Sequence, residues 1–135
     1  MPRYNRINLD GLQHIASAPS AAQTLPGDLV NLVGGKFVAA TAGLLRAYAV
    51  HTSDLSTDVE DPILIGGNIN GDKVESNRTF ALRLVASQTV ALDDELFIVE
   101  GGLTTTGTAG EGQFWANESV TTGVGENFLI SVTVK

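Results

Sequence analysis

Apolar and polar residues alternate with a period of two over several short segments of the chain. The clearest examples are residues 79–84 and 127–134, in which every second residue is large and apolar. Successive side chains of a β-strand point to opposite faces of the sheet, so this pattern predicts strands with one buried face. Glycine or β-branched residues interrupt every helical stripe, and only a single helical turn, at about residues 11–16, is expected.

Glycine, asparagine, aspartate and proline separate the apolar segments, as is typical of turns. Asn70-Gly71 is a strong hairpin signal, and Gly34-Gly35 and Gly101-Gly102 also favour tight turns. The pattern predicts eleven strands, at residues 28–33, 36–40, 44–51, 62–66, 72–76, 78–86, 88–91, 95–99, 103–106, 112–120 and 127–134. Many short strands on one chain predict an all-β protein, a compact β-barrel or sandwich of β-tulip or jelly-roll type.

The first 24 residues differ from the rest of the chain. They hold Pro2, Pro19 and a run of small residues at 16–22, with too few large apolar side chains to build a core. We therefore predict an extended N-terminal arm over residues 1–24 and a single β-domain over residues 25–135. A length of 135 residues fits one such domain.

Composition points to a surface that other proteins can cover. Only 17% of the residues are charged, against about 25% in ordinary soluble domains, so much of the surface is neutral. Residues 1–46 hold four basic and two acidic residues, and the remainder holds four basic and thirteen acidic ones, within a net charge of −7. The negative body argues against direct binding of nucleic acid, and the absence of long apolar runs argues against a membrane partner and favours a soluble chain.

The residues that carry chemistry do not form a recognisable catalytic set. There is no cysteine, which excludes disulfides and thiolate chemistry, and His14 and His51 have no metal-ligand spacing. Two acidic segments, at residues 54–61 and 93–95, are compatible with solvated turns or with a bound cation, and the sequence leaves that choice open. We expect no enzyme, no catalytic residue, no cofactor and no metal centre.

Phe114 and Trp115 are neighbours in a predicted strand and point to opposite faces. Either both aromatic rings belong to the core, or one is core and the other is an interface anchor. Trp115 is the candidate interface residue.

From residue 26 onward the order of these segments resembles that of tailed-phage capsid decoration (cement) proteins. The resemblance spans residues 25–134. The segments that carry it are Pro26–Val30, Gly35–Val38, Val85–Ala86, Val90–Leu96, Gly101–Gly102, Ala116–Glu118 and Gly125–Val132.

This resemblance implies a protein on the outer surface of the capsid in the virion, where it binds the expanded head, bridges capsomers and stabilises the shell. The implied partners are the major capsid protein and further copies of the chain, in a dimer or trimer. The arm would make the capsid contacts, through Arg3, Arg6, Ile7, Leu9, Leu12 and Ile15.

Two other functions remain open on the sequence. One is a different virion structural module with the same β architecture, such as the base of a head fibre or a tail or spike domain. The other is a small carbohydrate-binding β-sandwich, in which Trp115, Tyr4 and Tyr48 would stack on sugar rings.

Overall fold

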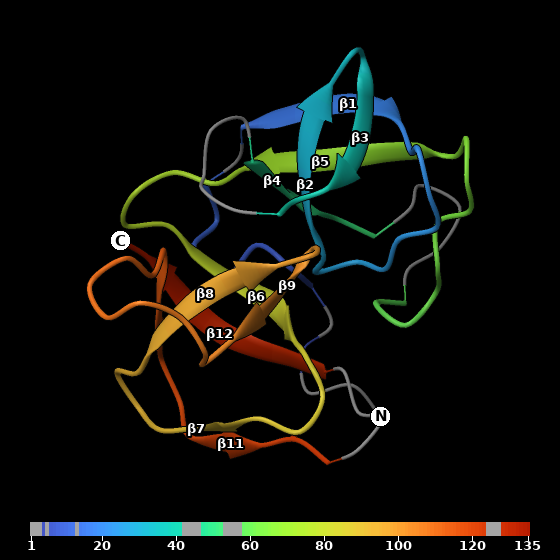
Figure 1. The fold of residues 1–135 in the computed structure, drawn as a ribbon. Coiled ribbons are helices and arrows are strands. Elements are labelled where there is room, and N and C mark those ends of the chain that lie inside the picture. The colour runs from blue at the N-terminus through green and yellow to red at the C-terminus, as the bar shows by residue number, and fades with distance from the viewer. Residues whose placement is uncertain (1–3, 5, 13, 42–46, 53–57, 124–127) are drawn as a thin grey trace.

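The computed structural model describes residues 4, 6–12, 14–41, 47–52, 58–123 and 128–135. This part of the chain is all-β, as predicted, and contains twelve strands and no helix (Figure 1). The strands are β1 (Ile15–Pro19), β2 (Leu29–Val33), β3 (Lys36–Ala39), β4 (Ala47–Val50), β5 (Asn68–Lys73), β6 (Thr79–Leu84), β7 (Thr89–Val90), β8 (Glu95–Val99), β9 (Gly102–Thr104), β10 (Phe114–Ala116), β11 (Val120–Thr121) and β12 (Phe128–Val134).

Five strands close into a barrel in the order β10-β12-β6-β9-β8. The longest pairing is antiparallel and joins β12 to β6, from Phe128 opposite Leu84 to Thr133 opposite Thr79. β7 and β11 form a separate two-stranded ribbon, seen at the lower end of the molecule in Figure 1. The compact β-barrel expected from the sequence is therefore present.

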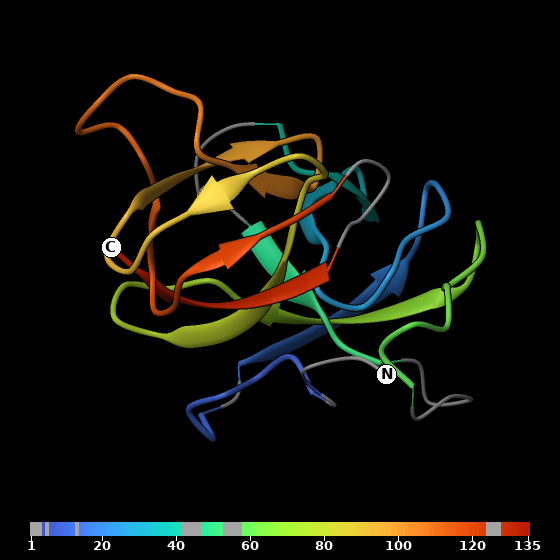
Figure 2. The same cartoon turned by 90° about the horizontal axis from the view of Figure 1, so that it is seen from below.

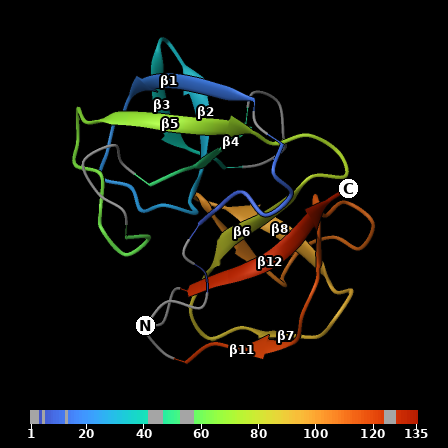
Figure 3. The same cartoon turned by 180° about the vertical axis from the view of Figure 1, so that it is seen from behind.

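The remaining five strands form a second sheet in the order β1-β5-β4-β2-β3, which lies above the barrel in Figures 1 and 3. The sheet curls back on itself, because Ser20, just after β1, bridges to Phe37 in β3. Gly34 and Gly35 connect β2 to β3 with φ angles of 58° and 80°. Positive φ at both positions is the requirement of a tight hairpin turn, so this turn signal is confirmed.

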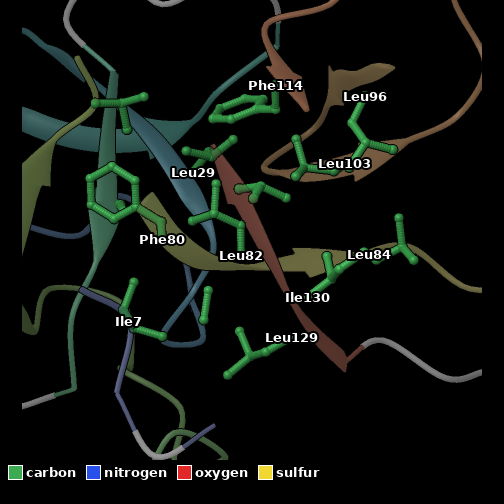
Figure 4. Packing of buried hydrophobic residues seen from close by; sticks show 14 of the residues in the cluster. Ile7, Leu29, Phe80, Leu82, Leu84, Leu96, Leu103, Phe114, Leu129 and Ile130 are labelled. Atoms are coloured by element: carbon green, nitrogen blue, oxygen red, sulfur yellow. The ribbon is translucent and has the colours of Figure 1, made fainter. Parts of the chain in front are cut away.

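The main core fills the barrel. Figure 4 shows side chains from β6, β8, β9, β10 and β12 meeting there, together with Ile7 and Leu29 from outside it. The members labelled in that view are Ile7, Leu29, Phe80, Leu82, Leu84, Leu96, Leu103, Phe114, Leu129 and Ile130. A smaller cluster, with Phe37 and Ile69 among its members, lies within the curled sheet. Burying each of the large side chains contributes about 1.5–3 kcal/mol to folding.

The described part of residues 1–24 does not form the separate extended arm that the sequence predicts. Ile7 is buried in the barrel core, and its carbonyl oxygen accepts a hydrogen bond of 2.8 Å from the amide of Ala81 in β6. Residues 15–19 are strand β1 and pair with β5 from Ile15 opposite Asp72 to Pro19 opposite Asn68. Small and polar residues therefore complete a sheet because a neighbouring strand supplies the hydrogen bonds. The helical turn expected at residues 11–16 is wrong for the same reason.

Two predictions between residues 62 and 76, one of a turn and one of a strand, are wrong. Asn70-Gly71 is not a hairpin turn, because both residues lie inside β5. A Cβ atom on Gly71 would lie 2.8 Å from the Cβ of Tyr48, so the glycine permits close approach of a neighbouring strand instead. The predicted strand 62–66 is a turn in which Ile63 makes one isolated bridge to Thr24.

Candidate interaction surface

A buried ion network joins the N-terminal segment to the body of the protein. The Arg78 guanidinium donates to Asp72 at 2.7 Å and to Asp10 at 3.2 Å. Arg78 is 5% exposed and Asp72 is fully buried. Asn8 adds a further hydrogen bond, of 2.8 Å, to Asp72.

The pKa shifts in this network follow from competing causes. Burial on its own raises the pKa of Asp72, but the hydrogen bonds from Arg78, the His14 amide and Asn8 outweigh it and hold the pKa below its ordinary value. Asp10 behaves in the same way: burial raises its pKa, whereas Arg78 and the amides of Thr79 and Leu12 bring it below the ordinary value. Both carboxylates are therefore charged in the folded protein at neutral pH.

The network also fixes the loop that precedes β1. Asn8 accepts from the Gly11 amide at 2.8 Å, and Asp10 accepts from the Leu12 amide at 2.9 Å. The Leu12 carbonyl oxygen accepts from Arg78 at 2.7 Å and also from the Asn8 amide group. The backbone of this loop is held on both sides, while the Leu12 side chain stays 61% exposed.

Leu12 opens onto a shallow pocket of about 260 Å³ that is also lined by His14, Glu75, Ser76 and Arg78. His14 Nδ1 lies 2.8 Å from Glu75 Oε1. This hydrogen bond is the main cause that lowers the pKa of Glu75. Ile15, the first residue of β1, is 43% exposed. We call Leu12, His14, Ile15 and Glu75 the N-terminal surface. Apolar side chains beside a hydrogen-bonded histidine and glutamate, on a fixed backbone, suit contact with another protein.

The predicted capsid-contact residues divide into two groups in the structure. Leu12 and Ile15 lie on the N-terminal surface, and Arg6 is exposed. Ile7 is 2% exposed and Leu9 packs against the barrel core, so these two side chains hold the fold together. The interpretation of Ile7 as a docking side chain is therefore corrected. Arg3 lies outside the described residues.

Trp115 and Phe114 take opposite sides of β10, as predicted. Phe114 is fully buried, and Trp115 is 42% exposed on the outside of the barrel. The Lys135 ammonium lies 4.2 Å from the centre of the Trp115 ring and also pairs with Glu95. The hydrogen bonds from Lys135 and from the amides of Gly110 and Gly112 lower the pKa of Glu95. Trp115 is thus available to a partner on one part of its surface and is positioned by Lys135 on another.

The three aromatic residues considered for sugar stacking do not share one exposed surface. Tyr48 packs edge-on against Phe37, with ring centres 5.3 Å apart, inside the smaller cluster. Tyr4 donates its hydroxyl to Glu118 and packs against the barrel core. Of the three, only Trp115 is more than one-third exposed.

His51 lies at the edge of the ion network rather than in a catalytic set. Its Nε2 is 3.3 Å from Asp72 Oδ2 without a well-aligned hydrogen bond. Burial lowers the pKa of His51, and the nearby Asp72 carboxylate only partly offsets this. Within the described residues, no group of three or more histidine, aspartate or glutamate side chains is arranged to hold a metal ion. Asp54, in the first acidic segment, lies outside those residues.

The ion network could not be found from the sequence. Asp10 is far from Asp72 and Arg78 along the chain, and Asp72 follows Asn70-Gly71, which indicates an exposed turn. The one available signal is Arg78 immediately before a strongly apolar strand.

Comparison with known proteins gives a likeness in fold. The N base of the head fiber protein gp8.5 of bacteriophage phi29, known from its crystal structure, is similar, with a TM-score of 0.61 and 12% sequence identity. The similarity covers 92% of this chain and 95% of the phi29 chain. No family model and no curated protein matches the sequence. Among the described residues, no helix is long and apolar enough to cross a membrane.

Proposed function

We propose that this chain is a structural protein of a tailed-phage particle and forms a base that attaches to the outside of the head, as part of a head fibre. The observation that carries this proposal is the shared fold, which extends over nearly the whole of both this chain and the phi29 head fibre base. The likeness extends into the N-terminal segment, because residues 25–135 alone make up less than 92% of the chain.

The partner in this proposal is the major capsid protein, and the N-terminal surface makes the contact. Leu12 and Ile15 supply exposed apolar area, and Arg6 lies in the same segment with an exposed positive charge. Because Arg78 and Asp10 already hold the loop, little backbone entropy is lost when it binds. A preformed contact of this kind is expected to gain affinity from a small number of apolar side chains.

A decoration role is the second candidate. It is favoured by the resemblance of residues 25–134 to cement proteins and by a second exposed apolar pair, Leu64 and Ile65, in a turn well away from Leu12 along the chain. A protein that bridges capsomers needs two contact surfaces, whereas a fibre base needs one.

The test is co-sedimentation of the purified chain with expanded heads of the encoding phage that lack this protein. The variant Leu12→Asp with Ile15→Asp places two charges on the N-terminal surface, and Leu92→Asp is the matched control, because Leu92 is 58% exposed in a different turn. We expect saturable binding of the wild type, at least about tenfold weaker binding of the double variant and unchanged binding of the control.

Absence of binding to heads in any state would refute the proposed function. Binding that the double variant retains in full would refute the assignment of the N-terminal surface. If bound protein also raises the temperature at which heads rupture, the decoration role replaces that of a fibre base.

A further inference from the structure

Leu64 and Ile65 form an exposed apolar pair on a rigid turn. They are 63% and 73% exposed. The turn is closed by a hydrogen bond of 2.8 Å from the Gly67 amide to the Leu64 carbonyl oxygen. Ser20 anchors it through two further bonds of 2.8 Å, one to Gly66 and one to Gly67.

Ile63, which precedes this pair, holds the turn against the body of the molecule. Ile63 is 4% exposed in the smaller core cluster, and its backbone exchanges hydrogen bonds of 2.7 and 2.9 Å with Thr24. The Leu64–Ile65 turn therefore presents two aliphatic side chains at a fixed place and direction. Side chains held this way lose little freedom when a partner covers them.

A groove on the barrel has mainly apolar walls, which suit the two aliphatic side chains of this turn. It has a volume of about 590 Å³, and its walls are Val85, Ile98, Val99, Glu100, Thr104 and Thr106, from β8, β9 and the residues that flank them. Val99 is 39% exposed there. Three aliphatic side chains and two threonine side chains leave Glu100 as the single charged residue of this barrel groove.

The turn and the groove lie on different parts of the molecule. In Figure 1 the loop before β5, which carries Leu64 and Ile65, is at the right edge of the upper sheet, whereas β8 and β9 lie in the lower half. Figure 2 also shows the start of β5 at the right edge, away from β8 and β9. The turn is fastened to Ser20 and Thr24, so it meets a barrel groove only on another molecule.

We propose that a second copy of this chain docks its Leu64–Ile65 turn into the barrel groove, in a head-to-tail contact that repeats around a closed ring. Charge favours this contact over one between two barrels. Exposed acidic residues on the barrel, such as Asp93 and Glu111, repel their counterparts on another barrel, whereas residues 63–68 carry no charge. A hydrophobic projection that fits a pocket elsewhere on the same protein gives a heterologous interface.

The size of the contact also favours a closed assembly. Stable interfaces bury about 800 Å² on each partner, which two aliphatic side chains alone do not supply. When each copy contributes one turn and one groove, every chain takes part in two contacts. This inference does not depend on attachment to a capsid.

The test is sedimentation of the full-length chain over a range of concentrations. The turn variant carries Leu64→Asn and Ile65→Asn, the groove variant carries Val99→Asp, and Val33→Asn is the matched control, since Val33 is 58% exposed in the β2–β3 hairpin. We expect association of the wild type and the control, and a dissociation constant at least about tenfold higher for each of the other two. Urea unfolding of every variant checks that the fold is kept.

Mixing the two defective variants gives the sharper result. The groove variant still has an intact turn, and the turn variant still has an intact groove, so the mixture restores one of the two contacts and associates more tightly than either variant alone, though more weakly than the wild type. A wild type that stays monomeric at all concentrations overturns the inference. So does association that survives both changes, or a mixture that associates no more tightly than either variant alone. If heads bind a chain that stays monomeric, the proposed function holds and the self-association proposed here is refuted.

Discussion

Replacing Arg78 with methionine removes the centre of the ion network while keeping a side chain of similar length. The guanidinium group of Arg78 contacts both oxygens of Asp72, at 2.7 and 3.1 Å, and both oxygens of Asp10, each at 3.2 Å. It also donates to the carbonyl oxygens of Leu12 and Lys73. Without it, the fully buried Asp72 carboxylate keeps hydrogen bonds from Asn8 and the His14 amide but loses its arginine partner, and the pKa of the nearby His51 ring is lowered by burial.

The expected cost is large for a single side chain. Removing one partner of a buried ion pair costs about 3–5 kcal/mol, because the remaining charge has lost its compensation. That is a substantial part of the 5–15 kcal/mol by which a domain of this size is typically stable. The free energy of unfolding, measured by urea titration at pH 7, should fall by about this amount.

The pH dependence of this loss of stability identifies the ion network as its cause. Asp72 and Asp10 have pKa values below 3.8 in the folded protein, so the stability they contribute is complete above that pH and is lost as the pH falls through their folded values. The difference between wild type and Arg78→Met should therefore shrink below about pH 4. The double variant with Asp72→Asn should lose less than the sum of the two single changes.

Hydrogen exchange gives a local measurement of the same effect. The amides of Leu12, His14 and Thr79 donate to Asp10 or Asp72, and they should exchange faster in Arg78→Met. A loss below about 1 kcal/mol at pH 7, or an equal loss at pH 3 and pH 7, would refute the assignment of this network as the anchor of the N-terminal segment.

Three further changes test other parts of the structure. Gly71→Ala should cost about 1–3 kcal/mol in urea unfolding, because the added Cβ would lie 2.8 Å from that of Tyr48; an unchanged midpoint would contradict the close approach. Trp115→Ala should cost only about 1 kcal/mol, since the ring is 42% exposed, and a loss near 4 kcal/mol would place it in the core. His51 has its folded pKa lowered from 6.5, so protonation favours the unfolded chain; wild-type stability should fall as the pH drops below about 6.5, and His51→Gln should show a weaker dependence over that range.

The strands that could be predicted are those in which side-chain burial follows the backbone period. In β12, Ile130, Val132 and Val134 are buried and alternate with half-buried Ser131 and Thr133. The β2–β3 hairpin could also be predicted, because its turn needs positive φ at two successive glycines. In these places the local sequence and the tertiary structure favour the same conformation.

The features that could not be predicted depend on contacts distant in sequence. β1 and β5 are rich in alanine, serine, asparagine and glycine, which have weak strand propensity, and they form because each pairs with the other. β6 is buried on both faces, including Arg83, whose Nε donates to the Pro26 carbonyl oxygen at 3.0 Å. The candidate site also depends on distant contacts. Leu12 and Ile15 could be predicted as contact residues, but the burial of Ile7 could not, because it depends on pairing with β6.

The position of β12 in the barrel affects how the protein is made. β12 lies between β10 and β6, so both of those strands have an open edge until Phe128–Val134 has left the ribosome. Unpaired strand edges are sites of association between chains, and pairings between distant segments form slowly. A chain truncated shortly before Phe128 would therefore be prone to aggregate.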